Sequence, residues 1–409
     1  MQKIGVIGGG PAGMMAAYRA AFHGNKVTLF EKNKQLGKKL LITGNGRCNV
    51  TNNCDMDSFL RHVNSNSKFL YRALSSFSSQ DMMKLLLQNQ CPVKEEDNGR
   101  IFPTSDASIT VLEAMASLLY KNGVDIHCNE AVTSLMIEDK ICKGLITQKD
   151  TYTFDTVILC TGGLCYPTTG STGDGYKWCK EAGIKITPLY PALTGLETND
   201  MDITALQGLS MHDVSIHCIS GKKKYKYRGD MIYTHYGISG PAVINLSNLM
   251  DRKQEWTIHM DTLPDMDASQ FEKNMLEKFQ ETPNRKISGI LTAFLPKRLS
   301  ASLLKKCNIN PDTPAHSITK ENRKALVETA KNISFPITGY RGFNEAMITH
   351  GGIDIHQVNP STMEIKSIQG LKVAGELLDV NAQTGGYNLQ IAWSTGYLAG
   401  DTICSQSKE

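Results

Sequence analysis

The stretch that decides the fold is Ile4-Gly5-Val6-Ile7-Gly8-Gly9-Gly10-Pro11-Ala12-Gly13. A short apolar strand runs into a glycine-rich turn, and an alanine-rich helical segment follows over residues 14–23. The glycines at 8, 10 and 13 fit G-x-G-x-x-G. The first permits the tight turn, the second lets the backbone approach a pyrophosphate, and the third lets the helix pack on the strand. The stretch therefore predicts the first βα unit of a dinucleotide-binding domain.

An acidic residue occupies the end of the second strand, where a dinucleotide-binding domain needs one. The second apolar strand, Lys26 to Phe30, ends at Glu31, 18 residues after Gly13. A carboxylate at this place can accept hydrogen bonds from a ribose diol and would repel a 2′-phosphate. FAD or NAD is therefore favoured over NADP. The competing interpretation is an ordinary βα turn followed by an incidental acid.

Three further segments favour FAD over NAD. A long loop with many glycines follows Glu31, where a simple NAD domain would soon place a crossover helix. Cys160-Thr161-Gly162-Gly163 ends an apolar strand, and Val373-Ala374-Gly375-Glu376 ends another. Gly385-Gly386-Tyr387-Asn388-Leu389 then opens an apolar helix, whose N-terminus could stabilise negative charge on a reduced flavin. Each segment alone could be a plain turn, but their order around one fingerprint indicates FAD.

Composition limits the classes of partner and compartment. The chain has 409 residues, 41% hydrophobic and 21% charged, which suits a folded protein of two or three domains. A net charge of +4 is too small to argue for nucleic acid or an anionic membrane as the main partner. Eleven cysteines without a CxxC pair indicate neither a disulfide framework nor a structural zinc site. We expect a cytoplasmic protein with a small-molecule substrate, no metal, no membrane and no nucleic acid.

At this point the sequence resembles a bacterial FAD-binding flavoprotein family that includes aminoacetone oxidase and 3-dehydro-bile-acid reductases, within the broader glutathione-reductase and fumarate-reductase type of FAD fold. The resemblance covers nearly the whole chain. Besides the glycine turn, it rests on these motifs: Leu36-Gly37-Lys38-Lys39-Leu40, Gly44-Asn45-Gly46-Arg47-Cys48-Asn49, Gly99-Arg100-Ile101-Phe102-Pro103, Tyr166-Pro167, Gly170-Ser171-Thr172-Gly173, Thr234-His235-Tyr236-Gly237-Ile238-Ser239-Gly240-Pro241, Leu378-Asp379 and Thr384-Gly385-Gly386-Tyr387-Asn388.

The resemblance implies an α/β fold built on a Rossmann-like FAD-binding domain of glutathione-reductase type. Residues 1–190 and 342–409 would form that domain. Residues 191–270 and 335–341 would form a β-rich substrate-side domain, and residues 271–334 a helical insertion. Patterns along the chain agree, because strand-like alternation prevails over 191–270 and helical spacing over 271–334.

The resemblance also implies site residues. Glu31 would bind the adenosine ribose, and Glu376 would contact the ribityl or pyrophosphate region. The segment 47–49 would lie along the flavin, and Asn388 and Leu389 would meet the isoalloxazine edge. From the glycine turn and the resemblance together, the residues expected to bind the cofactor are Gly8, Gly10, Pro11, Ala12, Gly13, Glu31, Lys32, Gly37, Lys38, Thr43, Gly44, Arg47, Cys48, Asn49, Val132, Thr161, Gly162, Gly163, Gly375, Glu376, Gly386, Asn388 and Leu389.

Other side chains have both a functional and a structural interpretation. His235 precedes a predicted helix start at Pro241. It is the expected catalytic residue, as a general acid or base, and the competing interpretation is a structural histidine. His350 has the same two interpretations and ranks below His235 as a catalytic candidate. Cys48 beside Arg47 could be a redox thiol, but a small residue packed by the cofactor is favoured. The basic run 222–228 is interpreted as a hairpin with solvated lysines rather than a nucleic-acid strip.

These observations predict an FAD-dependent oxidoreductase that transfers hydride through flavin N5. We expect a reductase of a conjugated carbon–carbon double bond of the enone type, with NAD(P)H as a transient electron donor. A small-amine oxidase that passes electrons to oxygen is the first alternative. A non-catalytic flavin-binding or RNA-modification-related protein is the second. No second G-x-G-x-x-G follows a strand, so a separate NAD(P)H domain is not expected.

Overall fold

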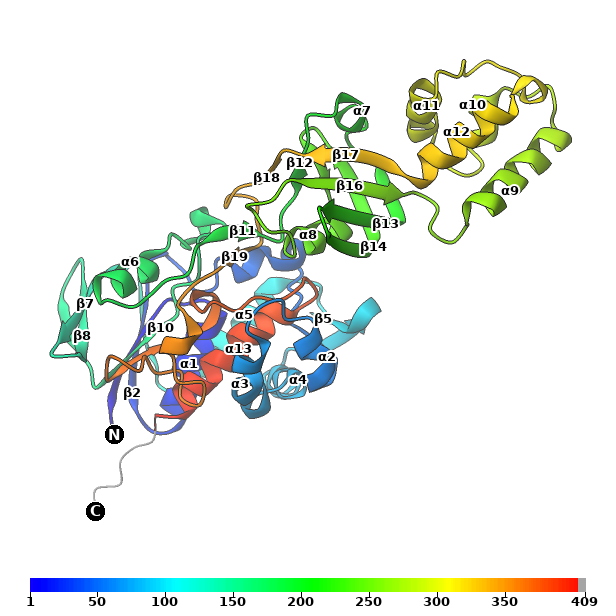
Figure 1. The fold of residues 1–409 in the computed structure, drawn as a ribbon. Helices are drawn as coiled ribbons and strands as arrows, with labels where there is room; N and C mark the ends of the chain where they lie inside the picture. The colour runs from blue at the N-terminus through cyan, green and yellow to red at the C-terminus, as the bar shows by residue number, and fades with distance from the viewer. Residues whose placement is uncertain (404–409) are drawn as a thin grey trace. The chain divides into compact units, whose positions relative to one another are not determined.

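A computed structural model describes residues 1–403 and divides the chain into two compact units (Figure 1). The first unit contains Met1–Ala192 and the chain from Phe343 onward, and the second is Leu193–Gly342. Residues 404–409, which end the predicted FAD domain, lie outside the described residues.

A five-stranded sheet is the centre of the first unit. Its strands pair in parallel in the order β20-β10-β1-β2-β6. The strands are β1 (Lys3–Ile7), β2 (Lys26–Glu31), β6 (Asp125–Cys128), β10 (Thr156–Leu159) and β20 (Leu371–Val373). Ile4 and Val6 are fully buried, as are Ile158 and Val373, because helices and loops cover both faces of a parallel sheet. The predicted α/β class is confirmed.

Two helices pack closely beside this sheet, α1 (Pro11–Phe22) and α13 (Tyr387–Asp401) (Figure 1). Glycines on α13 make the contact possible. A Cβ at Gly396 would overlap the carbonyl oxygen of Ala12, and one at Gly400 would overlap that of Ala16. The last helix of the chain therefore rests directly on the backbone of the first.

Smaller elements complete the first unit. Its other helices are α2 (Met56–Arg61), α3 (Tyr71–Ser76), α4 (Ser79–Gln88), α5 (Ser108–Lys121) and α6 (Asp174–Glu181). Its antiparallel sheets are formed by β3 (Thr51–Asn52), β4 (Val93–Glu96) and β5 (Arg100–Pro103), by β7 (Val132–Glu138), β8 (Ile141–Thr147) and β9 (Thr151–Thr153), and by β11 (Tyr190–Ala192) and β19 (Ile348–His350). The loop predicted over 32–53 contains one irregular 3₁₀ segment, η1 (Leu40–Gly46).

The second unit is built on a seven-stranded antiparallel sheet in the order β17-β16-β13-β14-β15-β12-β18. Its strands are β12 (Leu196–Glu197), β13 (Ser210–Ser220), β14 (Lys223–Thr234), β15 (Gly237–Ser239), β16 (Trp256–Asp261), β17 (Ile333–Ile337) and β18 (Gly339–Tyr340). The predicted helix start at Pro241 is confirmed, because α8 (Pro241–Ser247) begins there after Gly240. A short helix, α7 (Met201–Thr204), follows β12.

Four helices gather at one end of this sheet (Figure 1). They are α9 (Ala268–Glu281), α10 (Ile287–Leu291), α11 (Lys297–Lys306) and α12 (Lys320–Lys331). Trp256 of the sheet and Phe271 of α9 belong to one hydrophobic core. The β-rich and helical segments thus fold around shared apolar contacts. Their roles as a substrate-side domain and an insertion stay predictions.

We predict that Gly396→Ala destabilises the protein. The new methyl group must displace the backbone of α1 at Ala12, and overpacking of this kind costs typically about 1–3 kcal/mol. The gain in helix propensity, about 1 kcal/mol, offsets only part of this cost. Thermal unfolding should show a lower Tm. Gly342→Ala is the matched control, because a Cβ there meets nothing within 4 Å, and an equal loss in both variants would contradict the prediction.

Candidate functional site

Four parallel strands of the first unit end at one edge of the sheet, and the predicted cofactor residues follow them there. The glycine turn follows β1 and Glu31 ends β2. Thr161 to Gly163 follow β10, and Gly375 follows β20. Because these strands are parallel neighbours, segments that lie more than 300 residues apart in the chain meet at this edge. Ligands of open α/β sheets bind at such carboxyl ends.

The glycine turn has the backbone that its sequence predicts. Gly8 has φ +103°, a conformation that favours glycine, and a Cβ on it would overlap the carbonyl oxygen of Cys160. A Cβ on Gly13 would overlap the carbonyl oxygen of Gly8. A Cβ on Gly10 would meet nothing within 4 Å, so open space lies over the turn at this point. The turn has the close packing and the clearance that a pyrophosphate requires.

The first turn of α1 offers hydrogen-bond donors to this open space. Gly10 is the N-cap residue, and no side chain caps the helix. The amides of Ala12 and Gly13 stand in the first turn, where no helical carbonyl can accept from them. Pro11 at N1 lacks an amide, and its fixed φ suits a helix start. This end of the helix therefore favours an anion.

The Glu31 side chain is buried and holds the turn in place. Its Oε2 accepts from the amide of Gly9 at 2.8 Å, and its Oε1 accepts from the amide and side chain of Asn33 at 2.8 and 2.7 Å. Each carboxylate oxygen can accept two hydrogen bonds. Oε2 therefore keeps one acceptor position, which suits a ribose hydroxyl.

A buried hydroxyl beside the turn tests the fit of a dinucleotide. Thr161 Oγ1 is buried and has no hydrogen-bond partner, and the Thr161 backbone lies against Gly8. Buried hydroxyls without a partner are uncommon in folded proteins. The hydroxyl itself lies beside Gly175 of α6, so the features that fit the pyrophosphate half of FAD are the open space at Gly10 and the uncapped helix.

The loop after β2 folds back over the turn. The amide of Gly37 donates to the carbonyl of Gly9 at 2.9 Å. Lys38 Nζ donates to the carbonyl of Thr168 at 2.6 Å, and Lys32 Nζ contacts Asp174 at 2.7 Å. The ammonium groups of both lysines thus have protein partners in this structure.

Arg47 and Cys48, in the segment 47–49, have different surroundings. The Arg47 guanidinium bonds to Glu96 and Asp106 and lies 4.2 Å from the centre of the Phe102 ring, so its charge is already paired. The Cys48 thiol is fully buried, and burial raises its pKa to about 12. At neutral pH this thiol stays protonated, which disfavours the redox interpretation.

Asn49 joins this segment to the last helix. With its amide oriented by its neighbours, Asn49 donates to the carbonyl of Thr51 at 3.0 Å and accepts from the amide of Gly386 at 3.1 Å. Asn52 Nδ2 donates to the carbonyl of Gly385 at 3.0 Å. Two motifs separated by more than 300 residues are therefore hydrogen-bonded to each other.

The N-terminus of α13 can contribute backbone groups only. Gly386, the N-cap residue, has φ +98°. The side chain of Asn388 accepts from the amide of Ala382 at 2.9 Å and donates to the carbonyls of Ala382 and Gln383. It therefore holds the preceding loop, and the amides of Asn388 and Leu389 are the groups that face away from the helix end.

Glu376 lies in a polar network after β20. Its Oε2 pairs with Lys39 Nζ at 2.7 Å, and its Oε1 accepts from the amide of Thr349 at 2.9 Å. Thr349 Oγ1 accepts from the amide of Leu164 at 2.8 Å. The network connects three strand ends and fixes the carboxylate close to Gly163.

Sequence reasoning did not select Lys39 or Thr349 as site residues. Lys39 stands in a motif that was recognised, next to Lys38, and only the fold shows which of the two lysines meets Glu376. Thr349 had no signal in the sequence, because a threonine within a short strand is common. Gly375 contacts Ala12. The amide of Gly375 donates to Thr395 Oγ1 at 3.0 Å, and Thr395, like Thr349, had no signal in the sequence.

The remaining predicted residues lie at separate places. Val132 is the first residue of β7, and Gly162 has φ +74° beside Ser171. In η1 the chain bends at Thr43 and Gly44, and Thr43 Oγ1 donates to the carbonyl of Leu40. Their part in cofactor binding stays a prediction.

His235 lies in the second unit, in the two-residue turn between β14 and β15. Its side chain is exposed, and its ring packs edge-on against Tyr236 at 5.0 Å. The guanidinium of Arg341 lies 4.5 Å from the centre of the Tyr236 ring. His350 ends β19, and its Nδ1 is 3.1 Å from the side-chain nitrogen of Asn381.

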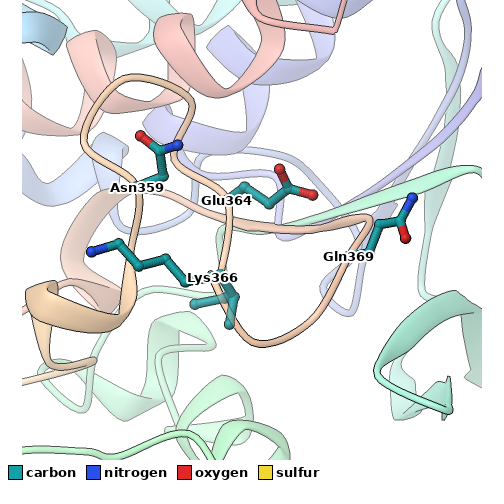
Figure 2. A pocket seen from close by; sticks show the side chains of 5 residues that line it. Asn359, Glu364, Lys366 and Gln369 are labelled. Carbon is teal, nitrogen blue, oxygen red and sulfur yellow. The ribbon is translucent and has the colours of Figure 1, made fainter.

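A separate pocket of about 370 Å³ lies in the first unit and is lined by Asn359, Glu364, Ile365, Lys366 and Gln369 (Figure 2). None of the predicted cofactor residues lines it. Glu364 Oε1 accepts from the amide of Gly370, and Lys366 Nζ donates to the carbonyl of His356, so its charged groups hold the surrounding loop.

Residues 1–403 lack two kinds of feature. No three or more histidine, cysteine, aspartate or glutamate side chains gather in a way that could hold a metal ion. No helix in this part of the chain has the length and apolar character to span a membrane.

We predict that Glu31→Ala weakens FAD binding about 10- to 100-fold, because hydrogen bonds to a charged acceptor contribute roughly 1.5–3 kcal/mol. The apoprotein should also melt at a lower temperature, since the amides of Gly9 and Asn33 lose their acceptor. FAD titration of the apoprotein measures the affinity. Glu138→Ala, an exposed acid on β7, is the control. An unchanged Kd for Glu31→Ala would place the ribose elsewhere.

Comparisons with known proteins identify the family of this chain. The model of the HI0933-like protein Rossmann domain matches residues 2–402. A 3-dehydro-bile acid Δ(4,6)-reductase of Clostridium scindens is 33% identical over 98% of both chains. A ribosomal RNA dihydrouridine synthase of Haemophilus influenzae is 30% identical, again over 98% of both chains.

Solved structures show the same fold. The 3-ketosteroid-Δ4-(5α)-dehydrogenase of Rhodococcus jostii has a TM-score of 0.55 at 14% identity and covers 99% of this chain and 97% of its own. A quinol fumarate reductase of E. coli has a TM-score of 0.51 at 15% identity and covers 98% of this chain and 70% of its own. With the family model matching nearly the whole chain, the protein belongs to the HI0933-like family of FAD-dependent Rossmann-fold oxidoreductases.

Proposed function

We propose that this protein is an FAD-dependent reductase that saturates a carbon–carbon double bond conjugated to a carbonyl group. One observation carries the proposal. Two relatives that match 98% of the chain have unrelated substrates, a bile acid and ribosomal RNA. Their names nevertheless describe one chemical change. The Δ4,6 bonds of a 3-dehydro bile acid are conjugated to its 3-ketone, and the C5=C6 bond of uridine is conjugated to its C4 carbonyl.

The chain's residues would divide this work. FAD held at this edge would, in its reduced form, supply the hydride for the conjugated double bond. The protein must then stabilise negative charge on the carbonyl oxygen and deliver a proton to the α-carbon. The α1 N-terminus and Glu31 would hold the adenosine and pyrophosphate half. The Lys39–Glu376–Thr349 network would position the middle of the cofactor.

The proton donor that we propose is His235. The imidazole ring has a nitrogen that can donate a proton, and its exposure leaves it accessible to a substrate. The edge-on contact with Tyr236 would orient the ring.

NAD(P)H is proposed as the electron donor. Because only one dinucleotide fingerprint occurs in the sequence, NAD(P)H would bind transiently and not in a domain of its own.

Anaerobic flavin spectroscopy tests the reaction class. We expect the reduced protein to be reoxidised by a Δ4-3-ketosteroid or by a uracil-containing oligoribonucleotide. The same steroid with its double bond saturated, and a dihydrouridine oligonucleotide, should leave the flavin reduced. NADH and NADPH are tested separately as reductants of the oxidised protein. Reduction of the oxidised flavin by a small primary amine, without reoxidation by any enone, would contradict the proposal and favour the amine oxidase.

The role of His235 has its own test. We predict that His235→Ala retains FAD and its visible spectrum while reoxidation by the enone slows about 10²- to 10⁴-fold, the usual size of general acid–base effects. Little change in Tm is expected, because exposed positions typically change stability by less than about 0.5 kcal/mol. His212→Ala, also exposed and in the same unit, is the control. Equal rates in the two variants would move the proton donor to another residue.

A further inference from the structure

The basic run 222–228 has two different faces in the folded strand. Along β14, Lys224 and Lys226 are exposed, whereas Tyr225 and Tyr227 are only half-exposed. Tyr227 accepts a hydrogen bond from Asn245 of α8 at 3.0 Å. The tyrosines therefore face the helix-covered side of the sheet and the lysines face solvent, as the two-residue period of a strand requires.

Neighbouring strands extend the solvent-facing side. Lys226 is paired with His217 of β13, and His217 is paired with His259 of β16. Side chains of directly paired residues lie on the same face of a sheet. Lys224, Lys226, His217 and His259 form what is called here the lysine face, and both histidines are half-buried.

Most other charges near the lysine face are paired. Arg228 bonds to Asp213 and Asp265, Lys223 lies 3.7 Å from Asp251, and Asp261 pairs with Lys331. Lys222, Lys224 and Lys226 have no acidic partner anywhere within residues 1–403. Asp213, Asp251, Asp261 and Asp265 are thus already paired with other cations, while Glu255, directly before β16, is an exposed acid.

The positive charges of two of these lysines affect the pKa of a neighbouring histidine, His217. Burial lowers the pKa of His217, and the positive charges of Lys224 and Lys226 lower it further, while Asp261 opposes them. An anion that approaches the face would stabilise the protonated imidazole and gain a further donor.

We propose that the lysine face binds the sugar–phosphate backbone of RNA. The inference rests on the proposed function, in which the uracil ring of an RNA is one form of the conjugated substrate. Lysines two residues apart on a strand are spaced by about 6.6 Å. They form a row of single positive charges, which suits the regularly spaced phosphates of a nucleic-acid strand. An anionic membrane fits less well, because the apolar side chain that the pairing places beside Lys224, Ile219, is half-buried, whereas entry into lipid needs a broad exposed apolar face.

The orientation of the tyrosines also limits the kind of binding. Bases usually stack on exposed aromatic rings in single-strand binders, but Tyr225 packs against Trp256 with ring centres 5.6 Å apart. The lysine face therefore contacts phosphates and not bases. Such contacts position an RNA without selecting its sequence.

The test uses the FAD-loaded full-length protein and a fluorescently labelled oligouridylate strand. Fluorescence anisotropy measures binding over a range of salt concentrations. The lysine-face variant, Lys222→Gln/Lys224→Gln/Lys226→Gln, removes both lysines of the face and the exposed Lys222 of the adjoining hairpin turn, and it should bind at least about tenfold more weakly near 0.1 M salt. The slope of log K against log salt should fall in magnitude by about 2, since each lost phosphate contact contributes about 0.7 for a single strand.

Two matched variants distinguish the effect of charge on the lysine face from the effect of the protein's net charge. Lys306→Gln/Lys320→Gln/Lys324→Gln removes three exposed lysines from α11 and α12 of the same unit and should bind like the wild type. Lys224→Arg/Lys226→Arg keeps the charge and should retain binding. Thermal melting and flavin absorbance verify that each variant is folded.

The outcomes distinguish this inference from the proposed function. Failure of the wild-type protein to bind the oligouridylate overturns the inference, even if a free Δ4-3-ketosteroid is still reduced. Equal weakening in both glutamine variants also overturns it, because binding would then follow net charge alone. If the lysine-face variant loses RNA binding and reduces the steroid at the wild-type rate, the inference is supported. If RNA binds at this face but no conjugated substrate is reduced, the reaction class alone fails.

Discussion

Close contact between backbones around the first turn of α1 is the constraint on which the first unit depends. Gly13 lies against the carbonyl of Gly8, and Gly8 lies against the carbonyl of Cys160. From the other end of the chain, Gly375 and Gly396 both lie against Ala12. Without side chains at these positions, the ends of β1, β10 and β20 and the helix α13 can approach one helix N-terminus. That convergence creates the amide-rich edge where a dinucleotide fits.

Much of the polar chemistry at this edge holds loops in place. The carboxylate of Glu31 binds amides of the turn and of Asn33, and the side chain of Asn388 binds the loop before α13. Arg47 is paired with acids of the β4–β5 region. What remains for a cofactor is largely backbone, namely the amides at the starts of α1 and α13. Backbone donors are positioned before the ligand arrives and need no reordering, which favours tight binding.

The two units divide the chemical tasks differently. In the first, the partly buried Lys39–Glu376–Thr349 network lies at the edge where we propose that the cofactor binds. In the second, we propose that the exposed His235 and the lysine face meet the substrate. The names of two full-length relatives give a bile acid and ribosomal RNA as substrates, so one fold in this family serves different substrates.

The sequence by itself determined the fold class. Helical spacing over 271–334 predicted the helices found there, such as α9 and α12, and the glycine spacing predicted the turn between β1 and α1, because local backbone requirements leave a direct signal in residue type. Only the tertiary structure decided which polar groups meet. Asn49 joins Gly386, and Lys39 rather than Lys38 pairs with Glu376, through contacts that span more than 300 residues. The two faces of β14 were likewise invisible in the basic run until the strand pairing oriented its tyrosines inward. Such pairings depend on sheet order and register, which are set by the packing of the whole unit and carry no local signal.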